Sequence, residues 1–139
     1  MYLLDTNVCI SFMRNDNQNL KNRLMSLNKD DCFLSSVTIA ELVYGVAKSR
    51  YQEQNRQNLV RFYTVIPKVL DFTSEDAEAF GVVRAYLEKE GTPIGLLDLQ
   101  IASQALTRNL TVVTHNTSEF FRIPGLKVID WSAPARSSL

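Results

Sequence analysis

Side chains that bind soft metals are scarce in this sequence. It has one histidine, His115, and two cysteines, Cys9 and Cys32, which lie far apart and form no CxxC pair. Structural zinc sites need four such ligands at short spacings, so the sequence argues against structural zinc. A disulfide scaffold would need more cysteines, and we expect both thiols to be reduced and in or near the core.

Glycine is also rare, and net charge is absent. None of the five glycines lies in a GxGxxG or P-loop pattern, which disfavours a nucleotide-binding or phosphate-binding regulatory module. Lysine plus arginine equals aspartate plus glutamate at 15 each, whereas a typical nucleic-acid-binding domain is basic. A nucleic-acid site must therefore depend on a local patch or on metal ions. Near-zero net charge also favours self-association.

Long apolar runs are missing as well. The run at the amino terminus, Tyr2–Leu4, is far shorter than a signal peptide or a membrane span. We therefore expect a cytoplasmic protein. The 139 residues, of which 45% are hydrophobic, suit a single globular domain. We assign residues 1–131 to this domain and residues 132–139 to a flexible tail.

Short apolar runs alternate with amphipathic stretches along the chain. The pattern predicts strands at 2–4, 32–37, 68–72, 110–114 and 127–130, and helices at about 8–13, 20–27, 38–47, 52–66, 74–90 and 97–108. A capping box over Thr38–Glu41 places the start of the third helix at Thr38. Trp131 should pack over the last strand. This alternation predicts an α/β fold with a mostly parallel sheet, whose strands all end at one edge, where ligands bind.

Carboxylates fall where that edge should be. Asp5 ends the first strand, Glu41 lies one turn into the third helix, and Asp98 lies in the first turn of the helix after Gly95. Each has a structural alternative as a helix cap or a partner of the helix dipole. Crowded carboxylates repel each other unless a cation is present, and their hard oxygens suit Mg²⁺ or Mn²⁺. Such a site can hydrolyse phosphodiesters.

Four segments with these acids carry a family resemblance. Leu4–Asn7, Ser35–Leu42, Pro93–Ala102 and Val112–Phe120 resemble, in order and spacing, the motifs of PIN-domain ribonucleases, and Pro124–Trp131 also matches. Nearly the whole chain is similar to VapC-type toxins of type II toxin–antitoxin systems. The resemblance implies a three-layer sandwich and an endoribonuclease that cleaves RNA, with tRNA and in particular initiator tRNA as the expected substrate, so that translation stops. It also implies a cognate antitoxin protein and a homodimer.

The resemblance further assigns roles to residues. It implies a catalytic acidic site of Asp5, Glu41 and Asp98, in which Asp5 and Asp98 bind Mg²⁺, with Mn²⁺ as a substitute. Many relatives have a fourth aspartate where this sequence has Asn116, whose carbonyl could ligate or whose amide could orient a water. Glu119 follows one turn later. It could restore the missing charge, or it could pair with Asn116 as a cap.

Polar neighbours of the acids have less certain roles. Thr6 and Asn7 follow Asp5, and in similar toxins such groups hydrogen-bond the first acid, although helix capping is an equal alternative. His115 lies in a predicted loop, which favours an exposed side chain without a catalytic role. Candidates for RNA contact are Arg14, Lys48, Arg50, Arg84 and Arg122. Tyr44 and Tyr51 could stack on bases, but packing on a helix face is the favoured alternative.

Partners give two further expectations. An arginine in a C-terminal segment of the antitoxin could bind the acidic site and occlude it. For the homodimer, the helices at 20–27 and 52–66 have more apolar residues than one small sheet requires. The surplus is expected at Val60, Phe62, Tyr63 and Ile66, although core packing would equally explain them. A PIN-fold nuclease of RNA processing or repair, without a toxin role, is the alternative function. The short chain favours the toxin.

Overall fold

A computed structural model of the chain describes residues 1–134, so residues 135–139, most of the expected tail, lie outside the described residues. The strands are β1 (Tyr2–Leu4), β2 (Cys32–Ser35), β3 (Val69–Leu70), β4 (Thr111–Val113) and β5 (Lys127–Ile129). The helices are α1 (Thr6–Arg14), α2 (Gln18–Met25), α3 (Ser36–Ala47), α4 (Gln52–Val65), α5 (Ser74–Lys89), α6 (Leu96–Arg108) and α7 (Thr117–Phe120), with a short 3-10 helix at Lys29–Asp31. Over the described part of the chain, no helix is both long and apolar enough to cross a bilayer.

The five strands form one parallel sheet in the order β3-β2-β1-β4-β5. Leu3 of β1 pairs with Phe33 on one side and with Val112 on the other. The chain builds the sheet outward from β1 through β2 to β3, then crosses to β4 on the opposite side. This reversal beside β1 is a topological switch point, where open α/β sheets bind their ligands. The predicted parallel sheet and the edge position of β5 are confirmed.

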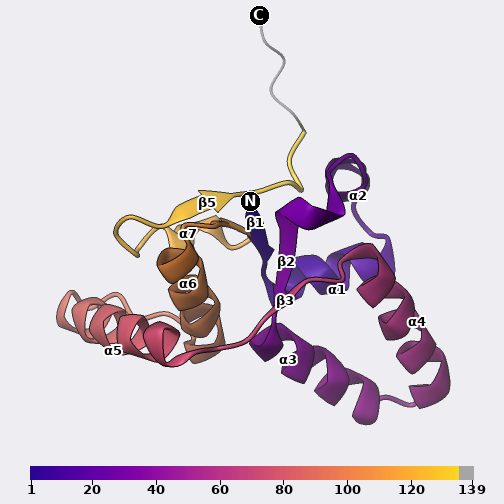
Figure 1. The fold of residues 1–139 in the computed structure, drawn as a ribbon, viewed down its shortest axis with the longest axis horizontal. Helices are drawn as coiled ribbons and strands as arrows, with labels where there is room; N and C mark the ends of the chain where they lie inside the picture. Colours follow the sequence, from indigo (N-terminus) through magenta and orange to yellow (C-terminus); the bar gives the residue numbers. More distant parts are fainter. Residues whose placement is uncertain (135–139) are drawn as a thin grey trace, which may run out of the picture.

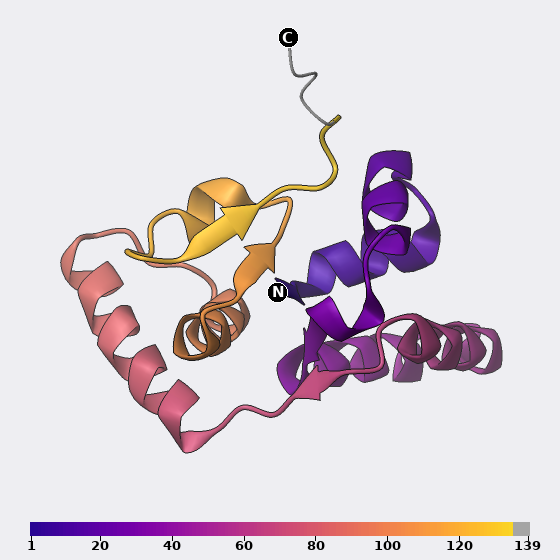
Figure 2. The ribbon, with the colours of Figure 1, turned by 45° about the horizontal axis from the view of Figure 1, so that its top comes forward.

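Helices cover both faces of the sheet, which gives three layers (Figures 1 and 2). Leu4 and Val113 point to the face covered by α1–α4, whereas Leu3 and Val112 point to the face covered by α5–α7. Successive strand residues therefore enter different cores, as the pleat requires. Trp131 is buried as expected, but it packs edge-on against Tyr2 of β1, with ring centroids 4.8 Å apart.

The start of α3 differs from the prediction. The helix begins at Ser36, and Ser35 is its cap, because the Ser35 hydroxyl accepts the Val37 N–H at 3.0 Å. The expected capping box over Thr38–Glu41 is therefore wrong. A serine at the end of a strand can cap the next helix as well as a threonine can, so the earlier residue took this role.

Two other expectations about side chains have clear outcomes. Both cysteines are free and buried. Of the apolar residues on α4 suggested as surplus, Phe62 and Ile66 lie in the core of the chain itself, at 3% and 2% exposed. Val60 is 49% exposed and Tyr63 is partly exposed, so only these two remain candidates for an interface.

Candidate active site at the carboxyl edge of the sheet

Asp5 lies where β1 ends, at the switch point. Its backbone N–H donates to the Val113 carbonyl at 3.1 Å, and its side chain accepts the Val8 N–H at 2.8 Å. Asp5 therefore caps α1, as one alternative predicted, yet it is only 2% exposed. Burial raises the pKa of Asp5, although hydrogen bonds from Thr114 and Val8 and the nearby charge of His115 oppose the rise. A buried carboxylate with this environment favours a cation beside it.

Thr114 is a site residue that the sequence did not reveal. It directly follows β4, the neighbour of β1, and is fully buried. Its hydroxyl hydrogen-bonds the Asp5 side chain, and its oxygen accepts the Asn116 N–H at 2.9 Å. One hydroxyl thus joins the ends of the two central strands. The available signal was a polar residue ending an apolar strand, but the pairing of β4 with β1 was needed to interpret it.

Asp98 lies in the first turn of α6, where it was expected. Burial, the charges of Asp5 and Glu119, and a hydrogen bond with the Glu119 side chain raise the pKa of Asp98 to about 6. These effects place Asp98 close to both acids. The structure thus brings Asp5, Asp98 and Glu119 to one place from three different elements.

The capping alternative for Asn116 and Glu119 is wrong. Asn116 precedes α7, but its side chain makes no capping hydrogen bond. Glu119 instead turns toward Asp98. The amide of Asn116 is therefore free of a structural role at this helix start, and Glu119 adds a negative charge next to the acids that the motifs single out.

Glu41 approaches from the other side, on the second turn of α3. Because α3 starts at Ser36, Glu41 is no longer explained by a capping box, and within residues 1–134 its carboxylate has no hydrogen bond or ion pair. It lines a groove of about 530 Å³ between α1, α3 and α4. Thr6 and Asn7 also line this groove, which connects Glu41 to the start of α1 and hence to Asp5.

Thr6 and Asn7 relate to Asp5 differently from what was expected. The Thr6 hydroxyl lies 3.0 Å from the Thr38 hydroxyl rather than on the first acid. The backbone N–H of Asn7 contributes to lowering the pKa of Asp5, while the Asn7 side chain is exposed in the groove.

Two of the candidate RNA-contact residues line the groove, and the other three lie elsewhere. Lys48 and Arg14 line the groove with Glu41, and the Lys48 ammonium lies 4.9 Å from the centre of the Tyr44 ring. Arg84 forms an exposed ion pair with Glu88 on α5 at 3.1 Å. The remaining candidates are Arg122, which donates to the Pro93 carbonyl at 2.9 Å, and Arg50 in the turn before α4.

Three single residues also have defined surroundings. Tyr44 and Tyr51 are 59% and 68% exposed, so the favoured alternative of packing on a helix face is wrong. His115 is exposed, as expected, and its Nδ1 atom lies 3.3 Å from Asp130. The Asp130 carboxylate in turn accepts the Ser132 N–H at 2.8 Å, and this bond holds the carboxylate next to the imidazole.

The acids suit a magnesium ion better than a metal held only by protein. Over residues 1–134, no three carboxylate, histidine or cysteine side chains converge tightly enough to form a complete ligand set. Mg²⁺ typically uses one or two carboxylates and completes its shell with waters and substrate phosphate. Asp5 and Asp98 provide such a pair, and a cation there would relieve the repulsion that raises the pKa of Asp98. The metal site itself stays a prediction.

Comparison with known sequences agrees with these features. The PIN domain family model matches residues 2–126. The chain is 40% identical, over 94% of its length and 98% of the relative's, to a protein of Shigella flexneri named tRNA(fMet)-specific endonuclease VapC. It is 39% identical to Ribonuclease VapC2 of Rickettsia felis, with the same shares of the two chains covered.

Solved structures give the same picture. A chain in the crystal structure of VapBC2 from Rickettsia felis, bound to a DNA fragment from its promoter, superimposes with a TM-score of 0.87 at 39% identity, over 94% of this chain and 98% of that one. DNA-bound VapBC from Salmonella typhimurium gives 0.87 at 40%, over 94% and 97%. FitAB bound to its IR36 DNA fragment gives 0.83 at 28%, over 99% and 100%.

Proposed function

The chain belongs to the PIN domain family and, within it, to the VapC ribonucleases, and from this membership we propose that it is the toxin of a type II toxin–antitoxin pair and an Mg²⁺-dependent endoribonuclease. The observation that supports this most directly is the group of Asp5, Asp98 and Glu119 at the switch point of the sheet. Within residues 1–134, none of these three acids forms an ion pair with an arginine or lysine, which would make the group structural.

Each residue of this site has a distinct task in phosphodiester hydrolysis. Bound Mg²⁺, or Mn²⁺ in its place, supplies an activated water and stabilises charge on the leaving oxygen. Asp5 and Asp98 would hold the ion, and Asp5 is kept in place by Thr114 and by the start of α1. Glu41 can accept a proton at its carboxylate, because no other group occupies it within residues 1–134. The Asn116 amide would orient a water.

We infer that the substrate is tRNA, with initiator tRNA as the first candidate, because the Shigella flexneri relative is named for this activity. Cleavage of initiator tRNA would stop translation. Arg14 and Lys48 would contact backbone phosphates near Glu41, and the exposed Tyr44 ring could stack on a base. These contacts would give a protein of zero net charge the local basic patch that RNA binding needs.

The antitoxin would occupy the same groove. Its lining includes a set of apolar side chains, namely Ile10, Met13, Leu42, Val46 and Leu59. A segment with apolar side chains would therefore fit this lining, and an arginine at its end could pair with Glu41 or with Asp5 and Asp98. We propose that the antitoxin inhibits by excluding RNA from the site. An antitoxin complex that retains full nuclease activity would contradict this.

The isolated chain should be a homodimer. Zero net charge opposes association little, and on α4 the Val60 side chain is 49% exposed and Tyr63 is partly exposed. Light scattering should give roughly twice the 15.8 kDa mass of one chain. A monomer at tens of micromolar would reject the dimer.

One experiment tests the enzymatic proposal. The purified chain is incubated with total tRNA and Mg²⁺, with EDTA, and with EDTA followed by excess Mg²⁺ or Mn²⁺, and the cleavage ends are sequenced. We expect cleavage at a defined site, abolished by EDTA and restored by either ion. Full cleavage in EDTA would reject the metal mechanism. If expression does not arrest growth although RNA is cleaved, a processing nuclease becomes the better description.

A further inference from the structure

Two threonine hydroxyls meet between α1, which Asp5 caps, and α3, which contains Glu41. Thr6 is the first residue of α1, directly after Asp5, and Thr38 is on α3, one turn before Glu41. Their Oγ1 atoms are 3.0 Å apart although the residues are 32 positions apart in the sequence. This hydrogen bond therefore joins the two helix starts from which the first two acids enter the site.

The neighbouring hydroxyls have structural tasks that Thr38 does not share. Ser35 caps α3, and the Ser36 oxygen accepts the N–H of Phe72 at 3.3 Å, which holds the chain after β3. Thr38 would have capped α3 if the helix had started where the sequence suggested. Because the helix starts two residues earlier, the Thr38 hydroxyl is free to reach Thr6.

The number of protons in the pair indicates which of the two hydroxyls donates the hydrogen bond. Two hydroxyls have two protons, but a single hydrogen bond between them uses one. Thr38 is fully buried, and within residues 1–134 its side chain has no other hydrogen-bond partner. A buried donor without an acceptor is costly, so Thr38 donates to the Thr6 oxygen. The proton of Thr6 is left over, and Thr6 lines the groove beside Asn7 and Glu41.

Arg14 and Lys48 offer charged donors in this groove, and a phosphate that lies next to the acids also gains from a neutral donor. Asp5, Asp98 and Glu119 are anions and repel the RNA backbone, whose free oxygens only accept hydrogen bonds. A neutral hydroxyl offers a donor without adding a charge that would compete with the metal ion. Thr6 is the neutral donor whose orientation the structure fixes, since its oxygen is already occupied by Thr38.

We propose that Thr6 donates a hydrogen bond to a non-bridging phosphate oxygen of the RNA and that Thr38 is a positioning residue that aims this hydroxyl into the groove. The inference rests on the proposed ribonuclease function. It adds a substrate contact between Asp5 and Glu41, and it assigns a role to a buried side chain that touches neither metal nor RNA.

The test is a cycle of valine substitutions, which keep the shape of threonine but remove the hydroxyl. Thr6→Val and Thr38→Val should each lower kcat/KM for RNA about tenfold to a hundredfold, the usual effect of losing a hydrogen bond to a charged group. The double variant should be no worse than Thr6→Val, because both changes remove the same contact. Thr38→Ser, which keeps the hydroxyl, should retain activity within about threefold.

A control and a second readout separate this role from a structural one. Ser103→Ala removes another fully buried hydroxyl, which donates to the Leu99 carbonyl at 2.7 Å within α6, and it should leave kcat/KM unchanged. The Mg²⁺ concentration for half-maximal rate should not change in either valine variant, because the hydroxyl contacts phosphate rather than metal. Rates are compared per folded protein, measured by circular dichroism.

The outcomes are distinct. If Thr38→Val does not fold, Thr6→Val and Thr38→Ser still decide, because Thr6 is only half-buried. Wild-type kcat/KM in Thr6→Val would overturn the phosphate contact, and losses that multiply in the double variant would overturn the role of Thr38. If the wild-type chain cleaves no RNA with Mg²⁺, the proposed function fails and this inference fails with it.

Discussion

Two buried aspartates of this molecule look alike locally and differ in what surrounds them. Asp5 at the edge of the sheet is 2% exposed, and Asp76 at the start of α5 is fully buried. Each accepts a backbone N–H at 2.8 Å and so organises a helix start, Asp5 from Val8 and Asp76 from Thr73. By sequence pattern alone, both are capping residues.

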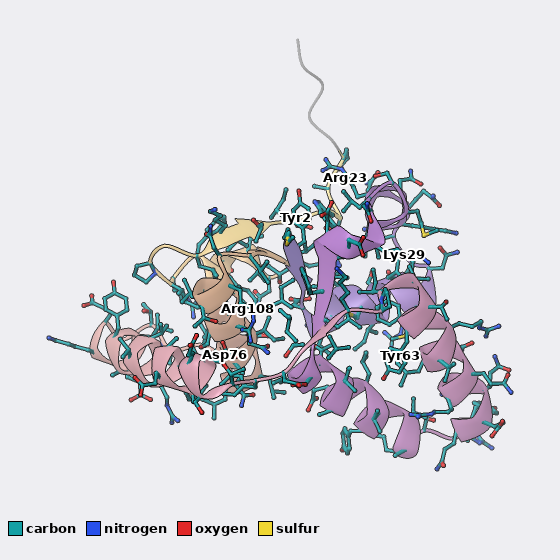
Figure 3. All side chains as sticks on the ribbon, in the orientation of Figure 1. Tyr2, Arg23, Lys29, Tyr63, Asp76 and Arg108 are labelled. Carbon is teal, nitrogen blue, oxygen red and sulfur yellow. The ribbon has the colours of Figure 1, made fainter. Side chains whose placement is uncertain are left out.

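The two carboxylates differ in whether a cationic side chain neutralises their charge. Arg108 of α6 reaches Asp76 at 2.7 Å (Figure 3). The Thr107 hydroxyl also donates to Asp76. Burial alone would raise the pKa of Asp76, but the hydrogen bonds from Arg108, Thr107 and Thr73 hold it below the usual value. For Asp5 burial prevails and the pKa rises. A buried carboxylate with its own arginine holds the fold together, whereas one without a cation is available to a cation from solution.

The largest expected difference between the two aspartates is in catalysis. Asp5→Asn should lower RNA cleavage about a thousandfold or more, because an amide cannot supply the negative charge that holds the metal ion. Asparagine is an equally good cap, so the fold should survive. Glu41→Gln and Asp98→Asn should behave in the same way.

Asp76→Asn is the matched control for this prediction. It makes the same chemical change in a buried aspartate at a helix start, and cleavage per folded molecule should be unchanged. RNA cleavage and growth assays are measured beside circular dichroism. If Asp5→Asn remains toxic, capping is the whole role of Asp5.

For stability, in contrast to catalysis, we expect the large effect at the site of Asp76. Arg108→Met leaves Asp76 buried without its cation, and the free energy of unfolding should fall by about 3 kcal/mol. Arg84→Met removes an arginine from an exposed ion pair on α5, with both side chains about half exposed, and should cost less than about 0.5 kcal/mol. Urea denaturation of both variants measures the difference. Equal losses would mean that the Asp76 ion pair is not structural.

The dependence of stability on pH gives a smaller effect with opposite signs in the two regions. The pKa of Asp98, which shares the site of Asp5, is raised to about 6. Protonated Asp98 therefore stabilises the metal-free fold at low pH, and this stabilisation is lost as pH rises from about 4 to 6. Asp98→Asn should therefore be more stable than wild type at pH 7 in EDTA, by about 1–2 kcal/mol once screening of this partly exposed side chain by solvent is allowed for, and equal to it near pH 4.

For Asp76 the sign is reversed. Its folded pKa is lowered, so its contribution is present above the unfolded value of about 4 and is lost as pH falls through the folded value. Asp76→Asn should weaken the fold at neutral pH and flatten its acid denaturation. Urea titrations from pH 3 to 8 follow both variants. If both variants shift stability in the same direction at pH 7, the contrast between the two sites is wrong.

Much of the fold could be predicted because its determinants are local. Apolar strands that alternate with capped helices implied the parallel sheet, and Asp5 and Asp98 were placed at its edge by the residues next to them. The predicted start of α3 was wrong because two residues close together give similar capping signals. Ser35 and Thr38 can both cap a helix, and only the path of the chain after β2 selects Ser35.

The remaining site features depend on contacts between distant segments. Thr114 meets Asp5 because β4 pairs with β1, and Glu119 meets Asp98 because α7 lies beside the start of α6. Neither contact has a periodic signature in the sequence. Likewise, Arg108 and Asp76 are 32 residues apart, so the sequence could not distinguish the neutralised aspartate from the unneutralised one.

The smallest effect is expected at Asn116, where the family resemblance implies a fourth aspartate in many relatives. Asn116→Asp adds a carboxylate at the start of α7, three residues before Glu119, where the Asn116 side chain makes no capping hydrogen bond. A further charge should tighten Mg²⁺ binding, but repulsion from the neighbouring acids offsets part of the gain. We expect the Mg²⁺ concentration for half-maximal cleavage to fall about twofold to fivefold, less than 1 kcal/mol. Asn55→Asp, which adds the same charge to the wall of the groove, should leave it unchanged. An equal shift in both variants would indicate a general field effect, and no shift in either would show that the side chain at position 116 does not reach the ion.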